Sequence, residues 1–392
     1  MELQNFDFGL APCRVRFGAG RLTEVADIAS QTNARKVAWV VDEHFQNAEG
    51  TSPLKSCIAL VAADSAIHAM PPGEPDTRSV EACHAFLRDQ DADLIVALGG
   101  GSTMDATKVA RLMLENPGGV AAVAQAQPPL MRPRPALICV PTTAGTGSEV
   151  SEMAVISEAG TDIKLRVRSR DGMAEVAILD PELLLSLPKG PTAHTGFDAF
   201  THAFEAYTSL RASEITDLLC RAAIEKLWRW LPYAVDDPQD LKARGECLLA
   251  STFAAIAFNS TELGLAHAIA APLGAQYHVI HGLGNALALP AVTAFNEPAI
   301  PAAKRNWLRH AMRSSTVTEG VCKMRERIGL DRGLVDCLPN GFDRDAVAEA
   351  AMKSGNIATN ARPPTRQAVE IILGAMRDRL DGALPPLDGT RF

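Results

Sequence analysis

Residues 94–114, LIVALGGGSTMDATKVARLML, join an apolar run to three glycines and then to a helical pattern. Leu94 to Leu98 predicts a buried strand, and Thr103 to Leu114 carries apolar residues at helical spacing. Glycines 99–101 let a backbone approach a pyrophosphate closely, and the helix that follows offers free N–H groups and a positive dipole end. A tight strand-to-helix turn without a ligand is the alternative. The stretch therefore predicts a parallel α/β sheet that binds phosphate at the carboxyl ends of its strands.

The same alternation extends on both sides of this stretch. Lys36 to Val41 (KVAWVV) and Ala136 to Val140 (ALICV) predict two more buried strands, and 78–88 predicts a helix between them. The segments 150–156 and 164–167 predict a hairpin. Ile178 to Pro188 then predicts a last extended piece and a turn. The N-terminal half is expected to be a parallel sheet flanked by helices.

The pattern changes after Gly190, where strand signals nearly vanish. The secondary-structure pattern is interrupted there by Pro188, Gly190 and Pro191. We therefore expect an α/β dinucleotide-binding domain over 1–188 and an all-α metal-binding domain over 189–392. Amphipathic helices are predicted at 193–209, 213–231, 239–258, 262–271, 299–313, 343–355 and 365–379. The tail from Gly382 is rich in Pro and Gly and is expected to be loose.

Composition restricts the classes of function. A length of 392 residues favours two domains, and 47% apolar with 21% charged residues is ordinary for a globular protein. The net charge of −8 argues against a nucleic-acid groove. Eight scattered cysteines without a CxxC pair favour reduced thiols and a cytoplasmic enzyme. No signal peptide and no membrane-spanning run is evident.

Two further segments suit a nucleotide cofactor. Asp42 ends the run KVAWVV, where a carboxylate can bond ribose hydroxyls and disfavour a 2′-phosphate, so NAD is preferred over NADP. A solvated Asp or a helix cap is the alternative there. Residues 141–148, PTTAGTGS, follow ALICV and offer hydroxyls and glycines at a neighbouring strand end, although a merely polar loop has the same composition.

Histidines and one aspartate predict a metal site in the second half. Asp198 and His202 are four apart in a helical pattern and so share one face. His267 lies in the helical stretch GLAHAIAAP, and His281 is expected in a loop after Pro272 and Gly274 break that helix. A surface polar pair and satisfied core histidines are the alternatives. One carboxylate with three imidazoles suits Fe(II), Zn(II), Mn(II) or Co(II).

Several of these segments together resemble the iron-dependent (group III) alcohol dehydrogenase family. They follow the family's order along the chain up to about residue 290. The matching segments are RVRFGAG at 14–20, GGGSTMDATK at 99–108, PTTAGTGSEV at 141–150, DPELLLSLP at 180–188, TGFDAFTHAFEAY at 195–207, and HxxxxPLGA with HGLGNALALP between 267 and 290.

The resemblance implies a dehydroquinate synthase-like fold and NAD(P)-linked hydride transfer between nicotinamide and a small alcohol or carbonyl. It implies that the metal, Fe(II) or Zn(II), is held by Asp198, His202, His267 and His281. It also implies a homodimer or higher homo-oligomer. The residues that it places at the cofactor are Asp42, Gly99, Gly100, Gly101, Ser102, Asp105, Thr142, Thr143, Thr146, Ser148, Lys164, Leu183 and Leu187.

One position departs from the family's pattern. Many members carry a further histidine four residues after the third ligand, often assigned to proton relay or substrate contact, and Ala271 stands there in this chain. His278 and His281 are the catalytic candidates, with His278, three residues before His281, as the substitute for the missing histidine. A loop histidine that faces solvent is the alternative for His278, and a water or ribose-hydroxyl chain is a third proton route. A maleylacetate reductase, a dehydroquinate synthase-type cyclase and a non-catalytic protein of the same fold remain alternatives.

Overall fold

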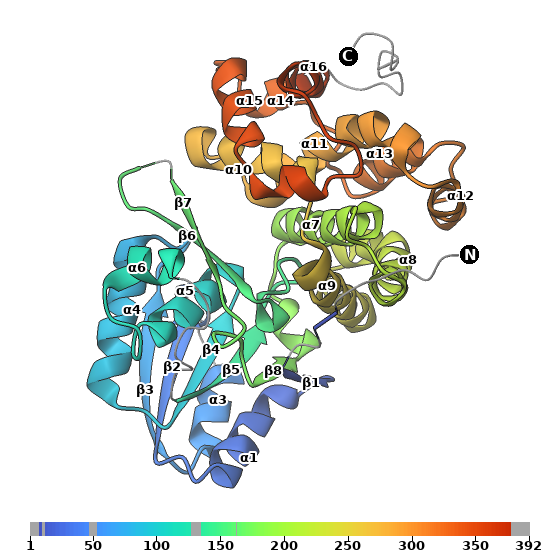
Figure 1. Cartoon of the computed structure of the whole chain (residues 1–392). Helices are drawn as coiled ribbons and strands as arrows, with labels where there is room; N and C mark the ends of the chain where they lie inside the picture. The colour runs from blue at the N-terminus through green and yellow to red at the C-terminus, as the bar shows by residue number, and fades with distance from the viewer. Residues whose placement is uncertain (1–7, 10–11, 47–52, 127–134, 162, 378–392) are drawn as a thin grey trace. The chain divides into compact units, whose positions relative to one another are not determined.

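The structure is a computed structural model that describes residues 8–9, 12–46, 53–126, 135–161 and 163–377. It divides into two compact units, Leu10–Leu187 and Pro188–Phe392, the latter together with Met1–Gly9 (Figure 1). This division is one of compactness; that residues 1–188 bind the nucleotide and residues 189–392 bind the metal stays a prediction. The tail from Gly382 lies outside the described residues.

The unit Leu10–Leu187 is built on a six-stranded parallel sheet in the order β1-β8-β5-β4-β2-β3. Its strands are β1 (Arg14–Phe17), β2 (Lys36–Asp42), β3 (Asp64–Met70), β4 (Leu94–Gly99), β5 (Ala136–Pro141) and β8 (Val176–Leu179). A separate antiparallel hairpin joins β6 (Met153–Ser157) to β7 (Lys164–Arg168). The predicted α/β fold, its three central strands and the hairpin are confirmed.

The central strands are apolar on both faces because helices cover them. Ile95 and Ala97 of β4 belong to one buried core with Val80 of α4 (Thr77–Gln90) and Val109 of α5 (Gly101–Leu112). Figure 1 shows α4, α5 and α6 grouped beside the sheet. The remaining elements of this unit are η1 (Arg21–Thr23), α1 (Glu24–Gln31), α2 (Glu43–Gln46), α3 (Pro53–Leu60), α6 (Gly119–Gln125), η2 (Ser148–Val150) and η3 (Pro181–Leu184).

Among the described residues after Pro188, the second unit contains helices and no strand, as the sequence predicts. Helices α7, α8 and α9 pack on one another, and α11 packs against α7, α10, α13 and α16. The helices are α7 (Lys189–Thr208), α8 (Glu214–Asp236), α9 (Leu241–Thr261), α10 (Leu265–Tyr277), α11 (His281–Asn296), η4 (Glu297–Ala299), α12 (Ala302–Ala311), α13 (Val317–Arg327), α14 (Leu334–Cys337), α15 (Arg344–Met352), η5 (Gly355–Thr359) and α16 (Arg366–Arg377).

Two expectations about this unit are wrong. Helix α10 does not break at Pro272 and Gly274 but continues to Tyr277, because packing against α11 and α15 outweighs the loss of one backbone hydrogen bond at proline. His281 therefore lies not in a loop but at the first position of α11. Among the described residues no single helix meets the length and hydropathy of a membrane span, although α9 and α10, bent by 103°, meet them as a pair.

Candidate metal and cofactor sites

Helix α7 carries the carboxylate and one imidazole of the expected metal site. Asp198 and His202 are buried in this helix, one turn apart as their spacing predicts. Phe197, Phe200 and Phe204 are fully or nearly fully buried along the same helix and anchor it in the core. The apolar burial of α7 thus holds two polar side chains in a fixed direction.

The other two histidines come from the first turns of α10 and α11. His267 is buried and is the third residue of α10, which begins after Gly264. His281 is the first residue of α11, and its side chain is 43% exposed. Three of the four expected ligands are therefore buried, and His281 is the one that solvent reaches.

The three imidazoles converge on one carboxylate oxygen, that of Asp198. The Oδ1 atom of Asp198 lies 3.5 Å from Nε2 of His267, 3.7 Å from Nε2 of His281 and 3.8 Å from Nε2 of His202. Two atoms that each lie about 2.1 Å from one ion at a tetrahedral angle are about 3.4 Å apart. The separations are thus longer than ordinary hydrogen bonds and suit ligands that share a cation. Ligand atoms of Asp198, His267 and His281 all lie within 4.8 Å of one another, and His202 completes the set through its 3.8 Å approach to Asp198.

Burial and charge act in opposite directions on these groups. Burial would raise the pKa of Asp198, but the neighbouring imidazoles outweigh it and hold that pKa well below its usual range. Burial lowers the pKa of His202 to about 4, despite the attraction of Asp198. Burial also opposes a charge on His267, but Glu205 and Asp198 outweigh it and raise that pKa to about 9. The point between the two carboxylates therefore favours positive charge.

Sequence reasoning missed two buried residues that contact this set. Asn285 of α11 donates from Nδ2 to Asp198 Oδ1 at 2.7 Å and lies 3.0 Å from His267 Nε2. Glu205 of α7 lies with its Oε2 atom 2.6 Å from Nδ1 of His267. The available signal for Glu205 was its spacing, because a residue seven after Asp198 returns to the same helix face. Asn285 had the weaker signal of lying four residues after His281.

The glycine turn and the loop after β5 lie side by side. Gly99 pairs with Pro141 in the parallel register, and the Thr142 amide donates to the Gly99 carbonyl at 3.0 Å. A Cβ atom on Gly101 would lie 2.6 Å from the side chain of Thr146, so only glycine permits this approach. Gly100 precedes α5, which begins at Gly101 rather than at Thr103. Two glycine-containing loops thus meet at neighbouring strand ends.

Asp105 and Ser148 contact each other rather than standing apart. The Ser148 hydroxyl donates to Asp105, whose other oxygen accepts the Val155 amide at 2.9 Å. Lys108, buried in α5, donates to the carbonyls of Ser148, Ser151 and Met153. These contacts fasten the loop that carries Thr142, Thr143 and Thr146 to the helix that follows the glycine turn.

The remaining expected cofactor residues are spread over the same unit. Asp42 ends β2 and accepts the His44 amide at 2.9 Å, as a cap of α2. Lys164 of β7 pairs with Glu74 and donates to Ser157 at 2.8 Å, and burial lowers its pKa. Leu183 is buried in η3, and Leu187 is the last residue of this unit.

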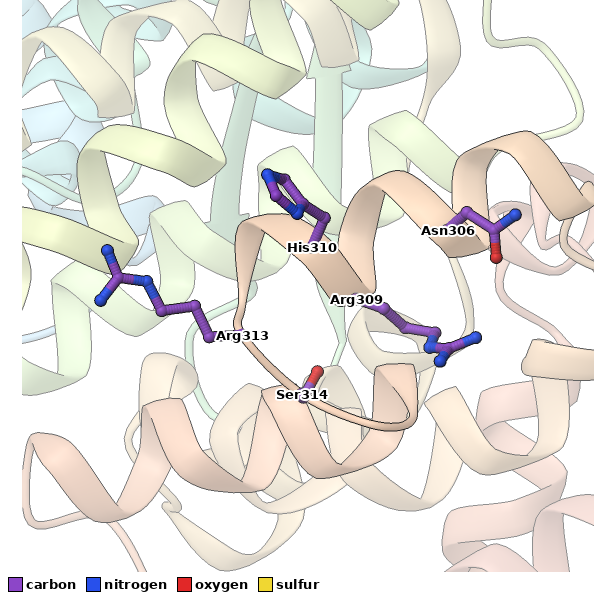
Figure 2. A pocket seen from close by; sticks show the side chains of 5 residues that line it. All are labelled: Asn306, Arg309, His310, Arg313 and Ser314. Carbon is purple, nitrogen blue, oxygen red and sulfur yellow. The ribbon is translucent and has the colours of Figure 1, made fainter.

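His278 and one surface hollow are not among the groups that converge on Asp198. His278 ends α10 in a left-handed conformation, with an exposed side chain. A hollow of about 660 Å³ is lined by Asn306, Arg309, His310, Arg313 and Ser314. Figure 2 shows that Arg309 and Arg313 point away from each other there. Those side chains do not converge on a point that a ligand would occupy.

Comparison with known proteins identifies the family. Residues 12–181 match the family described as iron-containing alcohol dehydrogenase, and residues 192–376 match the C-terminal part of the Fe-containing alcohol dehydrogenase family. A probable alcohol dehydrogenase EutG of Salmonella typhimurium is 36% identical over 357 residues, which are 90% of each chain. The chain belongs to the iron-containing alcohol dehydrogenase family.

Other relatives of this iron-containing alcohol dehydrogenase support the same family assignment. The 1,3-propanediol dehydrogenase of Klebsiella pneumoniae is 31% identical over 95% of this chain and 99% of its own length. A crystal structure of 1,3-propanediol oxidoreductase superimposes with a TM-score of 0.87 at 29% identity, covering 95% of this chain and all of the other. A sulfoacetaldehyde reductase from Bifidobacterium kashiwanohense, in complex with NAD+, also gives 0.87 at 26% identity, over 95% and 99% of the two chains.

These relatives confirm the predicted activity and cofactors. The iron-containing alcohol dehydrogenase is an NAD(H)-linked enzyme that uses a divalent metal. A maleylacetate reductase from Agrobacterium tumefaciens shares the fold at 23% identity, which shows the architecture and nothing about the reaction.

Proposed function

We propose that Asp198, His202, His267 and His281 hold the divalent metal of this alcohol dehydrogenase. The observation that carries this assignment is the convergence of three imidazole nitrogens on one buried carboxylate oxygen at 3.5–3.8 Å. A bound divalent metal supplies Lewis-acid polarisation of a carbonyl or hydroxyl oxygen. The mixed oxygen and nitrogen donors suit Fe(II) or Zn(II), and the family favours iron.

NAD(H) is assigned to the glycine turn and the loop beside it. Helix α5 begins at Gly101, the last residue of the glycine turn, and its first N–H groups, which have no intrahelical partners, can bind a pyrophosphate. Thr142, Thr143 and Thr146 lie in the loop that Lys108 and Asp105 fasten. The carboxylate at the end of β2, Asp42, favours NAD over NADP.

The other expected cofactor residues divide into two groups. Ser102 and Leu183, with Leu187, are proposed to touch the cofactor directly. Asp105, Ser148 and Lys164 are already engaged with other side chains, so we propose that they shape the cofactor loops.

The exposed side of His281 is the proposed entrance for a small alcohol or aldehyde. The other three ligands are buried, so solvent reaches the set beside this imidazole. Oxidation of an alcohol transfers a hydride to nicotinamide and releases the hydroxyl proton. Because Ala271 provides no ionisable group, we propose that this proton leaves toward solvent with exposed His278 as its acceptor. Relatives named for 1-propanol, methanol and 1,3-propanediol support a short alcohol.

Location and assembly are proposed from the same features. All eight cysteines are free thiols, which suits a reducing compartment and hence the cytoplasm. A homo-oligomer is proposed from the family likeness, and size-exclusion chromatography with light scattering tests it.

An NADH-oxidation assay with a panel of short aldehydes tests the metal assignment. Activity is measured on the purified enzyme, after removal of metal with a chelator, and after addition of Fe(II) or Zn(II). Asp198→Ala is measured in parallel for activity and metal content. We expect chelation and Asp198→Ala both to abolish turnover, and re-addition of metal to restore only the wild type. Full turnover by metal-depleted enzyme would contradict the proposed site.

A maleylacetate reductase activity is the second candidate, and Ala271 is the residue that favours it. The convergence of three histidines on Asp198 disfavours it, because that set supports a metal-dependent alcohol dehydrogenase. Including an unsaturated keto acid in the substrate panel separates the two activities.

A further inference from the structure

We propose that Glu205 is a positioning residue that builds the metal site by orienting His267 and by holding the start of α10. The inference rests on the proposed role of His267 as a ligand. Glu205 is buried on α7, seven residues after Asp198, and its carboxylate accepts three N–H donors. The donors are Nδ1 of His267 at 2.6 Å, the Gly264 amide at 2.9 Å and the Ala266 amide at 2.7 Å.

The contact with His267 fixes the imidazole tautomer. A carboxylate only accepts hydrogen bonds, so a proton on Nδ1 of His267 is held toward Oε2 of Glu205. Nε2, which lies 3.5 Å from Asp198 Oδ1, is then the ring nitrogen that gives up its proton to offer a lone pair to a metal. Ligating histidines characteristically donate their other ring N–H to such a partner, which fixes the ring and strengthens it as a ligand.

The two amide contacts fix where α10 begins. Gly264 precedes the helix and has no side chain to cap it, and Glu205 accepts the amides of Gly264 and Ala266 instead. The glycine is required, because a Cβ atom there would lie 2.8 Å from Oε1 of Glu205. The same carboxylate therefore ties the ligand His267 and its helix to α7, which carries Asp198.

A plain helix cap is the competing explanation, and the chain contains a matched example of one. Asn360 accepts the Leu265 amide at 3.2 Å at the same helix start, but no contact between Asn360 and His267 occurs among the described side chains. The two residues share the capping role, and Glu205 also contacts the imidazole, whereas Asn360 also bonds the Asn296 side chain and the Arg362 carbonyl. Their substitution separates capping from ligand positioning.

The experiment compares Glu205→Gln, Glu205→Asp, Asn360→Ala and Asp198→Ala with the wild type. Zn(II) affinity is measured by competition with a chelator, stability by thermal unfolding without metal, and the tautomer of His267 by ¹⁵N NMR of the imidazoles. Glutamine offers one acceptor oxygen where three donors converge, so at least one donor faces the amide NH₂. We expect Glu205→Gln to weaken Zn(II) binding by about 10- to 100-fold. We expect Glu205→Asp, which keeps both oxygens, to recover part of the loss.

The outcomes separate this inference from the proposed metal site. Weaker Zn(II) binding and a changed His267 tautomer in Glu205→Gln, with near wild-type affinity in Asn360→Ala, support the positioning role. If Asn360→Ala weakens Zn(II) as much as Glu205→Gln does, Glu205 is only a cap and the inference is overturned. It is also overturned if Asp198→Ala loses Zn(II) while Glu205→Gln binds it normally. Equal binding by wild type and Asp198→Ala overturns the metal site itself.

Discussion

Gly282→Ala is expected to weaken metal binding although it replaces none of the proposed ligands. Gly282 follows His281 in α11, and a Cβ atom there would lie 2.1 Å from the carbonyl oxygen of His194 and 2.7 Å from its carbonyl carbon, in α7. Those atoms belong to helix backbone and have no rotamer to change. Ordinary contact begins near 3.4 Å, so the start of α11 must retreat from α7 by about 1.3 Å.

That retreat acts directly on one ligand pair. His281 Nε2 now lies 3.7 Å from Asp198 Oδ1, and displacement along that line takes the separation to about 5 Å. Two ligands of one tetrahedral ion lie about 3.4 Å apart, so we expect Zn(II) affinity to fall at least about tenfold. Stability changes less, since overpacking costs about 1–3 kcal/mol and replacing a helical glycine by alanine returns up to about 1 kcal/mol.

Gly284→Ala is the matched control on the same helix. Its Cβ atom would lie 3.2 Å from the Cβ atom of Ala270, which a small shift accommodates. Zn(II) affinity by chelator competition and unfolding in urea are measured for both variants. The control is expected to bind Zn(II) like the wild type. Wild-type affinity in Gly282→Ala, with the protein folded, would refute the claim that close α7–α11 contact sets the ligand spacing.

Three further outcomes are expected. Lys108→Met, which leaves three loop carbonyls and Asp105 without their buried cation, should lower stability by about 3 kcal/mol and weaken NADH binding measured by fluorescence. Asp76→Ala should cost about 0.5–2 kcal/mol in urea unfolding at pH 7, because Asp76 caps α4. Burial opposes the charge of Asp76, but hydrogen bonds from Ser79 and Arg78 outweigh it and lower the pKa of this carboxyl in the folded protein. The stabilisation by Asp76 is therefore fully present above the pKa of the unfolded chain and is lost as the pH falls through the lower pKa of the folded protein. Alkylation at pH 8 followed by mass spectrometry should label at most three of the eight thiols in the native protein. Five cysteines are buried and therefore inaccessible to the reagent, namely Cys57, Cys83, Cys139, Cys220 and Cys247. Burial also raises the pKa of Cys83 to about 12, so its reactive thiolate form is scarce at pH 8.

The central strands were predictable because burial on both faces leaves a mark in the sequence. β2, β4 and β5 are continuous apolar runs for this reason. The edge strands β1 and β3 are half exposed and mix charged with apolar residues, so RVRF and DSAIHAM gave no comparable signal. Position in the sheet therefore decided which strands could be recognised.

Helix boundaries near the site were less predictable, because packing decided them. Pro272 lies inside α10, where local propensity predicts that the helix ends. Because of that wrong prediction His281 was expected in a loop, whereas it is the first residue of α11. The pair Asp198 and His202 was predictable from spacing on a single helix. Asn285 was not, because its contacts with Asp198 and His267 join residues 87 and 18 positions apart.

The helix that carries each proposed ligand determines which contacts hold that ligand in position. Helix α7 supplies Asp198, His202 and Glu205 from one face and is anchored by buried aromatic side chains, so its own spacing fixes them. His267 and His281 instead come from the first turns of two other helices, where backbone N–H groups lack intrahelical partners. What fixes those ligands is whatever fixes the helix starts: the Glu205 carboxylate for α10, and the close approach at Gly282 for α11. Substitutions at these two non-ligand positions should therefore disturb metal binding more than the spacing of the ligands in the sequence suggests.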